Sequence, residues 1–508
     1  MSHENFDVIV IGAGHNGLVA ANYLAKAGKK VLVLERRDVT GGQLAAISFE
    51  GSASFDALHP GGQLRPDIIR DLELARHGLS ATPDELPIYR SLLPDGRQLY
   101  LVADGNDAQT LASIREFSAR DAARWPEFVA FMDTAAAFLD AAYRTPMPRL
   151  PHVDAWSEGL PLAKLAWKLR RLGGKDMFRV IRAMSMSAQE LTEDWFESEP
   201  LRAAIAAVAI HGMTLGSMSA GTGYTLMHNW LNRGGLAHRQ NGGGARITEA
   251  LVAALQARGG QVRTNSKVQR ILVERQQVRG VRLADGEEIA TAAVFSAADP
   301  RHTLLGLVGA VELPPEFVWH TQSIKMRGSV AKVHLRTDGS HGLPQGTLAI
   351  APTIKYLERA FDAAKYGEVS TQPYLEVTRS GGSVSIHFQF APYALRHDNW
   401  EKARAPLEQL AIDTLAVHFP QLKPSIRGVR SITPVDLETT YGLTEGDLNH
   451  GQLILDQMFF MRPMPGWSNH RTPIDGLHLC GSGVHGGGGI SGASGRNAAR
   501  LALKGKRF

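Results

Sequence analysis

The first apolar segment of the chain is a run of four residues, Val8 to Ile11, which is typical of a buried parallel strand. After a glycine-rich stretch, residues 18–25 place apolar side chains at helical spacing, and Gly28 stands where a helix would end. A second apolar run, Val31 to Leu34, leads into Glu35. The pattern therefore predicts a strand, a glycine-rich turn, a helix and a second strand.

The glycine-rich turn, "IGAGHNG", has the spacing of a dinucleotide-binding motif. Gly12 allows the tight turn, Gly14 lets a pyrophosphate approach the backbone, and Gly17 lets the helix pack on the strand. The helix N-terminus offers free N–H groups to the phosphates. Glu35 lies where an acid binds a ribose hydroxyl, and its carboxylate would repel the 2′-phosphate of NADP. The motif alone leaves NAD and FAD open.

In the middle of the chain, the spacing of apolar residues changes more than once between the period of a helix and that of a strand. Residues 70–240 are largely helical in pattern. A helix is expected at Arg246–Arg258, followed by a strand from Val268 and a meander that turns at Asp285–Gly286. Further on, alternation predicts a half-buried strand whose apolar face carries Val384, Ile386, Phe388 and Phe390.

The C-terminal region repeats the strand-to-helix arrangement. An apolar run from Leu477 to Cys480 enters a stretch rich in glycine, and a helix follows at about Gly492–Leu503. This turn can present backbone N–H groups to another part of the same ligand. A long dinucleotide such as FAD needs contacts of both kinds, so the two ends of the chain are expected to meet.

Composition limits the function further. A chain of 508 residues favours two domains. The single cysteine, Cys480, excludes an internal disulfide and a CxxC redox motif. A net charge of +5 without a nucleic-acid-binding signature predicts no nucleic-acid partner, and no metal ligands are assigned. No segment has the length of a membrane span, and the polar N-terminus predicts no signal peptide, so we expect a soluble cytoplasmic protein.

Residues 160–184 are an exception to this ordinary pattern. They mix leucine and aromatic side chains with seven lysines and arginines and only one acid. A basic amphipathic helix can lie on an anionic membrane surface. The alternative is a solvated helix face, and the sequence leaves both open.

The two terminal motifs, "VIVIGAGHNGLVAANYLAKAGKKVLVLERRDVTGGQ" and "GLHLCGSGVHGGGGISGASGRNAA", resemble the phytoene desaturase-like flavoproteins. The likeness is strongest to the branch called pyridine nucleotide-disulfide oxidoreductase domain-containing protein 2-like, which "PVDLETTYGLTEGDLNHGQLILDQMFFMRP" also resembles. The resemblance implies tightly bound FAD and an FAD-dependent oxidoreductase. This chain has Gln43 where carotenoid desaturases commonly carry arginine, and Val484 and His485 within a motif that usually reads "THPGAG". These departures weaken the inference that the substrate is a carotenoid.

The resemblance also implies which residues contact FAD. Gly12, Gly14 and Gly17 match the pyrophosphate turn, Glu35 the ribose acid, and Gly41 and Gly42 a second glycine pair. Val268 matches the position whose backbone meets adenine. Gly481, Gly483, Ile490 and Ser491 match the turn that faces the flavin N1–O2 edge. Further contacts are expected within these motifs and in the loop after Phe55, at His15, Asn16, Arg36, Gln43, Gly61, Gly62 and Ser482.

The resulting fold prediction is α/β, with a Rossmann-like FAD-binding domain and a substrate domain of helices and mixed sheet. The FAD-binding domain is expected to be discontinuous, from residues 1–75, 240–310 and 450–508. Residues 76–239 and 311–449 are expected to form the substrate domain. This division follows from the positions of the two glycine-rich turns at opposite ends of the chain.

The expected chemistry is hydride transfer between flavin N5 and a C–C bond of a hydrophobic molecule, in either direction. Such chemistry needs no strong side-chain base, so no catalytic residue is assigned; His485 and His59 are weak candidates for a proton shuttle. The electron acceptor, oxygen or a quinone, stays open. Two alternatives remain: an amine oxidase-like enzyme acting on C–N bonds, and a flavoprotein with an interaction or assembly role.

Overall fold

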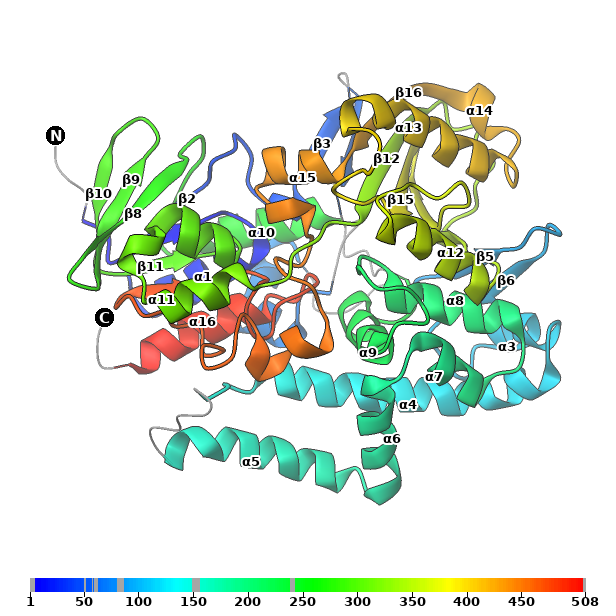
Figure 1. The fold of residues 1–508 in the computed structure, drawn as a ribbon, viewed down its shortest axis with the longest axis horizontal. Helices are drawn as coiled ribbons and strands as arrows, with labels where there is room; N and C mark the ends of the chain where they lie inside the picture. The colour runs from blue at the N-terminus through cyan, green and yellow to red at the C-terminus, as the bar shows by residue number, and fades with distance from the viewer. Residues whose placement is uncertain are drawn as a thin grey trace.

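The computed structural model describes residues 5–49, 52–56, 58, 63–79, 86–148, 156–237 and 243–505. Within these ranges the chain forms a parallel sheet and a larger mixed sheet, which lie at opposite ends of an elongated molecule (Figure 1). Both termini lie at the end that holds the parallel sheet. The predicted α/β class is confirmed.

The parallel sheet has five strands in the order β17-β11-β1-β2-β7. They are β1 (Val8–Ile11), β2 (Val31–Leu34), β7 (Gln261–Arg263), β11 (Val294–Ser296) and β17 (Leu477–Leu479). All of them fall within the three segments expected to form the FAD-binding domain. The order brings the C-terminal strand two places from the N-terminal one, so residues 8–11 and 477–479 belong to one sheet.

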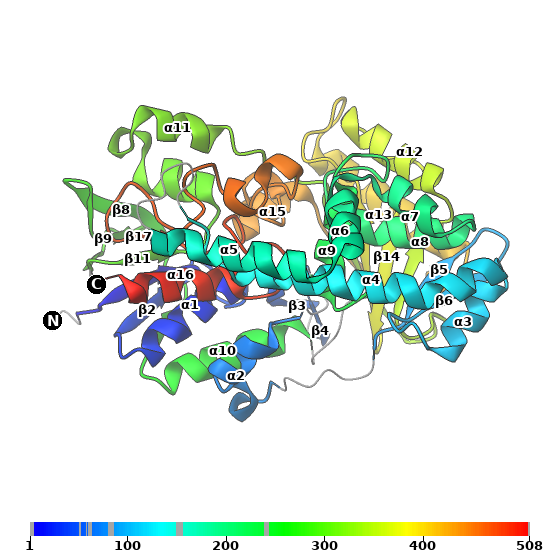
Figure 2. The same ribbon diagram turned by 90° about the horizontal axis from the view of Figure 1, so that it is seen from below.

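Both faces of the parallel sheet are covered, which explains the continuous apolar runs in its strands. Val8 and Val10 pack against three helices, α1 (His15–Lys26), α10 (Gly244–Gln256) and α16 (Ala493–Lys504). Ile9 and Ile11 pack on the other side, against a three-stranded meander. The meander comprises β8 (Val268–Glu274), β9 (Gln277–Leu283) and β10 (Glu288–Ala290), and it turns at Asp285–Gly286 as expected. Helices α1 and α16 lie side by side (Figure 2).

The mixed sheet has seven strands in the order β16-β12-β15-β14-β13-β5-β6. They are β5 (Tyr89–Leu92), β6 (Gln98–Leu101), β12 (Val330–Thr337), β13 (Thr347–Ile350), β14 (Leu375–Ser380), β15 (Ser383–Gln389) and β16 (Ile426–Ile432). Residues 70–240 are largely helical, as expected, but they also contain strands β5 and β6, which the pattern did not predict. Each is only four residues long, too short for its alternation to stand out from helical surroundings.

Strand β15 is buried on both faces, so the expectation of a half-buried strand was wrong. Val384, Ile386 and Phe388 pack in one apolar core with α13 (Trp400–Ala416). The polar side chains of His387 and Gln389 are also buried, because the segment after α8 (Glu199–Ile210) covers them. The alternation of apolar and polar residues along β15 was predicted correctly, but the polar face of the strand packs against protein and is not exposed to water.

Most of the remaining helices lie beside the mixed sheet, whereas the helices at residues 66–71 and 315–322 pack against opposite sides of the parallel sheet. These remaining helices are α2 (Pro66–Asp71), α3 (Ala108–Arg115), α4 (Ala119–Arg144), α5 (Trp156–Arg171), α6 (Gly174–Ser185), α7 (Ala188–Trp195), α9 (Thr222–Arg233), α11 (Pro315–Gln322), α12 (Ile354–Lys365), α14 (Leu422–Ser425) and α15 (Pro434–Tyr441). A short hairpin joins β3 (Ala46–Phe49) to β4 (Ser52–Asp56). Across the ranges described, no helix is both long enough and apolar enough to span a bilayer.

Candidate functional site

The three glycines of the first turn have different structural roles. Gly12 adopts a φ of +94°, which favours glycine. A Cβ on Gly17 would overlap the carbonyl oxygen of Gly12, so this glycine lets α1 pack on β1. A Cβ on Gly14 would meet no atom of the described residues within 4 Å. Gly14 is therefore not required by packing, and it lines an open cleft where a ligand can approach the backbone.

Glu35 lies beside this turn at the end of β2. Its carboxylate accepts hydrogen bonds from the backbone N–H of Ala13 at 2.9 Å and of Arg37 at 3.0 Å. The side chain is buried and lines the cleft, so its remaining lone pairs can accept hydroxyl groups of a ligand. Arg36 lines the same cleft but donates to the carbonyl of Thr439. Val268 and its neighbours Ser266 and Lys267 complete this end.

The second glycine pair packs onto the first turn. Gly41 has a φ of +115°, and its N–H donates to the carbonyl of Ala13 at 2.9 Å. A Cβ on Gly42 would lie 3.3 Å from the Cα of Gly14. Gly42 and Gln43 line the cleft, and the Gln43 amide donates to the carbonyl of Leu448 at 2.7 Å. The pair brings the two loops into close approach.

The C-terminal turn meets the first turn, as the resemblance implied. The Asn16 amide donates to the Ser482 hydroxyl at 3.1 Å across 466 positions of sequence. Ser482 and Ile490 line the cleft system, whereas Gly481 and Gly483 are packing glycines that lie close to other backbone. The backbone carbonyl of Ser491 accepts from Arg65 N–H at 3.1 Å. His59, Gly61 and Gly62 fall outside the described residues.

The cleft contains buried polar atoms that find no partner among the described residues. They belong to side chains on its wall, namely His15 (Nε2), Asn16 (Oδ1) and His450 (Nδ1). Burial, together with nearby His450, lowers the pKa of His15 to about 4, so its ring is neutral near neutral pH. Buried polar atoms are normally satisfied. Their unmet hydrogen bonds and the open face of Gly14 fit a dinucleotide rich in hydroxyl and phosphate oxygens.

The cleft leads into an inner cavity between the C-terminal turn and α9. The two share His15, Gln43 and Ser482 in their walls. Residues on successive turns of α9 form one wall of this cavity, namely His228, Asn229, Asn232 and Arg233. The rest of the lining combines apolar Met213, Leu448 and Ile490 with polar side chains such as His211 and Asn449. Sequence reasoning missed this wall entirely. His450, which the sequence did not single out, also lines the cleft and has a φ of +57°.

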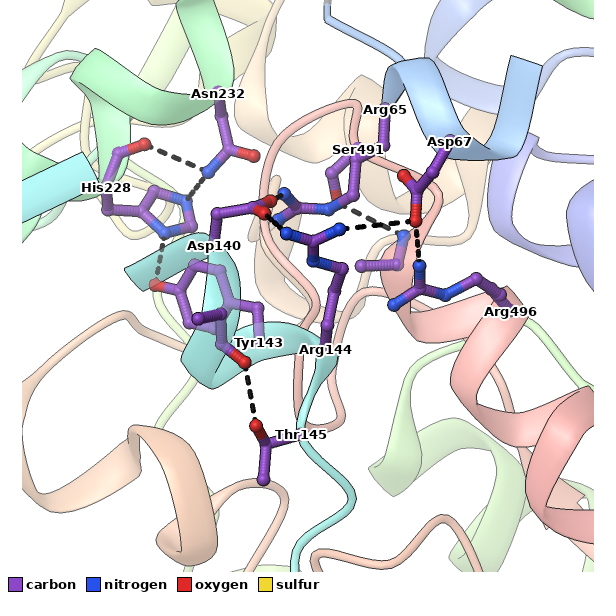
Figure 3. Close-up of polar contacts among 12 residues, drawn as sticks. Arg65, Asp67, Asp140, Tyr143, Arg144, Thr145, His228, Asn232, Ser491 and Arg496 are labelled. Atoms are coloured by element: carbon purple, nitrogen blue, oxygen red, sulfur yellow. Dashed lines mark hydrogen bonds and ion pairs between the residues drawn. The ribbon is translucent and has the colours of Figure 1, made fainter. Parts of the chain in front are cut away.

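The His228 ring is held in a chain of hydrogen bonds (Figure 3). Its Nδ1 lies 2.7 Å from the Tyr143 hydroxyl, and its Nε2 lies 3.1 Å from the Asn232 amide. Burial, with the charges of Arg462 and Arg65, lowers the pKa of His228 to about 3. A Cβ on Gly488 would lie 2.8 Å from the His228 ring, so the C-terminal turn touches α9 directly.

A network of ion pairs holds the C-terminal turn from the other side (Figure 3). Arg65 and Arg144 both pair with Asp140 on α4. Asp67 pairs with Arg496 on α16 and lies 3.6 Å from Arg144. Because the backbone N–H of Arg65 also binds Ser491, this network connects α2, α4 and α16 to the turn.

His485, a weak catalytic candidate, makes a structural contact. Its Nε2 donates to the carbonyls of Ala142 at 3.2 Å and Thr145 at 3.1 Å, at the end of α4. Burial lowers its pKa to about 4. This geometry favours the structural alternative. Cys480 is fully buried, and burial raises the pKa of its thiol.

The sequence family of flavin-containing amine oxidoreductases matches residues 17–503. The rat pyridine nucleotide-disulfide oxidoreductase domain-containing protein 2 is 32% identical, over 98% of this chain and 93% of that protein. A lycopene-forming phytoene desaturase of Pseudescherichia vulneris is 26% identical, over 98% and 99%. A solved structure of putrescine oxidase bound to putrescine superposes with a TM-score of 0.58 at 17% identity, over 99% and 100%. The predicted resemblance, fold and flavin cofactor are confirmed.

Proposed function

The chain belongs to the flavin-containing amine oxidoreductase family and is an FAD-dependent oxidoreductase, and from this premise we propose that it transfers hydrogen at a C–C bond of a hydrophobic substrate. The observation that carries the proposal is the inner cavity. None of the described residues in its wall is an acid, a phenylalanine, a tyrosine or a tryptophan, and one is an arginine. An ammonium substrate would need a carboxylate or aromatic rings, so the wall favours C–C over C–N chemistry. The relationship to a phytoene desaturase supports the same choice.

We assign the FAD contacts to the residues that meet in the cleft. Gly14 and the α1 N-terminus would hold the pyrophosphate, Glu35 the adenosine ribose, and residues 266–268 the adenine. The turn around Ile490 would face the flavin. When bound, FAD supplies the hydride acceptor and donor of the reaction. The discontinuous FAD-binding segments and the substrate segments meet at the inner cavity, where α9 and the C-terminal turn exclude water and orient the substrate.

The test is anaerobic reduction of the bound flavin. The purified holoprotein is mixed with pools of hydrophobic compounds that carry an oxidisable CH–CH bond and, separately, with amines of matched carbon skeleton, and bleaching of the visible flavin band is followed. We expect bleaching by the first class. Bleaching by amines with peroxide release in air would establish the C–N alternative. No bleaching by either class, together with no anaerobic reoxidation of the dithionite-reduced flavin by unsaturated hydrophobic compounds, would support an interaction role. Reoxidation by oxygen against a soluble quinone then identifies the electron acceptor.

We also propose that α5 and α6 contact an anionic membrane surface. The exposed fractions of Trp167 and Phe178 are 65% and 69%, and Leu160 and Ile181 are exposed as well. The two helices lie at the periphery of the molecule, along the edge below α4 (Figure 1). Their excess of lysine and arginine complements anionic headgroups.

Vesicle co-sedimentation tests the membrane contact. Vesicles containing phosphatidylglycerol should bind the protein, and pure phosphatidylcholine vesicles should bind it less. Trp167→Glu should abolish the difference. Trp319→Glu is the matched control, because Trp319 is 63% exposed on α11, away from this surface. Equal binding of the two variants would contradict the proposal.

A further inference from the structure

Arg233 ends helix α9 and forms part of the inner cavity wall. Its side chain is 2% exposed. The Nη2 group donates to both carboxylate oxygens of Glu376, at 3.0 Å each. Glu376 lies on β14 and is 3% exposed. The ion pair therefore joins α9 to the mixed sheet beside the inner cavity.

The guanidinium has more donors than the ion pair uses. Its Nε and Nη1 groups are buried and make no hydrogen bond to the described residues. An arginine is always charged and carries five N–H donors. Burying such donors without an acceptor is unfavourable, whereas a charge-assisted bond to an oxygen is among the strongest that proteins make. Two buried N–H groups of Arg233, beside the cavity, thus lack acceptor oxygens among the described residues.

The neighbouring side chains add positive charge around Arg233 and so further favour an acceptor oxygen there. On the adjoining strands, His387 is paired with Lys332 of β12 and with Glu376 of β14. Its ring stacks on that of His211, another cavity residue, with centroids 4.0 Å apart. Burial, with His211 and Lys332, lowers the pKa of His387 well below its usual range, so it adds no charge. This buried row therefore holds two basic residues, Arg233 and Lys332, against one carboxylate.

We propose that Arg233, held by Glu376, binds the carboxylate or carbonyl oxygen of an otherwise apolar substrate in the inner cavity. The inference rests on the proposed function and narrows its substrate to amphiphiles with a terminal oxygen group. The polar head meets the guanidinium, and the apolar body lies along Met213, Leu448 and Ile490. Glu376 is a positioning residue, because it fixes the guanidinium without reaching the ligand.

The experiment measures binding to the FAD-loaded protein by calorimetry, with probes that share one alkyl chain: decanoate, methyl decanoate and decylamine. Decanoate should bind most tightly, the ester more weakly and the amine least. Arg233→Gln alone leaves the buried Glu376 carboxylate without its arginine, so the double variant Arg233→Gln/Glu376→Gln is also tested. It should weaken decanoate binding about ten- to a hundredfold, which is the value of a charge-assisted hydrogen bond. Arg120→Gln, at a surface ion pair, is the control and should change nothing.

Three results would overturn the inference. Decylamine could bind wild-type protein more tightly than decanoate. Decanoate could bind the double variant as tightly as wild type. The variant could also shift the flavin potential and spectrum while decanoate affinity stays constant, which would show that Arg233 serves the cofactor. The binding experiment involves no turnover, so it is independent of the proposed reaction. If decanoate binds in an Arg233-dependent way but no C–C donor bleaches the flavin, the proposed reaction is refuted and the binding site is retained.

Discussion

Gly14 and Gly17 belong to one motif, but the structure separates their roles, and this gives a sharp prediction. A Cβ at residue 14 would meet nothing within 4 Å, and Gly14 already has φ −72° and ψ 166°, which alanine adopts freely. A Cβ at residue 17 would overlap the Gly12 carbonyl oxygen. Gly14→Ala should therefore impair FAD binding and spare the fold, and Gly17→Ala should damage the fold itself.

The expected magnitudes follow from these contacts. Gly14→Ala gains about 0.4–1 kcal/mol from the restricted unfolded chain and loses a similar amount because alanine is a poorer N-cap than glycine. The free energy of unfolding of the apoprotein should thus change by less than about 1 kcal/mol. Displacing the pyrophosphate from one backbone N–H should cost about 1.5–3 kcal/mol, a loss of about ten- to a hundredfold in FAD affinity. Gly17→Ala should lower the free energy of unfolding by about 1–3 kcal/mol.

The assay uses apoproteins of wild type and both variants. Urea unfolding gives the stability of each, and titration with FAD, followed by quenching of flavin fluorescence, gives the affinity. The reasoning fails if Gly14→Ala binds FAD as tightly as wild type, because the open face would then not be a ligand face. It fails equally if Gly14→Ala loses as much stability as Gly17→Ala.

Three further predictions concern other residues of the site. Glu35→Ala should weaken FAD binding about ten- to a hundredfold without changing the potential of the flavin once bound, and unchanged affinity in a titration would show that Glu35 is not the ribose acid. His485→Gln keeps a donor for the end of α4 and should preserve stability and flavin reduction, whereas His485→Phe should lose about 1–3 kcal/mol; a slowed reduction in a fully stable His485→Gln protein would instead indicate catalysis. Several buried histidines have a pKa of about 3 or 4 in the folded chain, namely His15, His228, His470, His478 and His485. Below pH 6.5 protons therefore bind the unfolded chain preferentially, and the free energy of unfolding should fall from pH 6.5 toward 4 by up to about 1.4 kcal/mol per pH unit for each ring. Urea unfolding at stepped pH measures this fall, and a flat profile would contradict it.

The dinucleotide end of the site was predictable because its function depends on the backbone. Positive φ at Gly12 and Gly41, and close approach at Gly17, each demand glycine, so the requirement is visible in the sequence. Even there, sequence could not tell a packing glycine from a ligand-facing one. Gly481 and Gly483 were expected to face the flavin, but each of them packs against other backbone or Pro300. Only the neighbours that the fold supplies make that distinction.

The substrate end was not predictable, because it is made by side chains from distant segments. His228, Asn229, Asn232 and Arg233 form a polar stripe on α9, and such a stripe normally indicates a solvated helix face. In the structure all four are at least nine-tenths buried. Glu376 and His387, which complete the surroundings, follow more than 140 residues later. The polar face of β15 misled the sequence analysis for the same reason.

A helix that is polar on one face and buried on every side must satisfy that face internally. On α9, His228 and Asn232 do so with each other and with Tyr143, and Asn229 does so with the carbonyls of Val208 and His211. Arg233 does so only in part, through Glu376. His228, Asn229 and Asn232 thus have their hydrogen bonds satisfied within the protein. Arg233 retains two donor groups, Nε and Nη1, without an acceptor among the described residues. The chain is similar both to a protein named as a phytoene desaturase and, in fold, to one named as a putrescine oxidase. We therefore expect its substrate choice to depend on the contrast between the neutral side chains of α9, whose hydrogen bonds are satisfied, and Arg233, which has donors to spare.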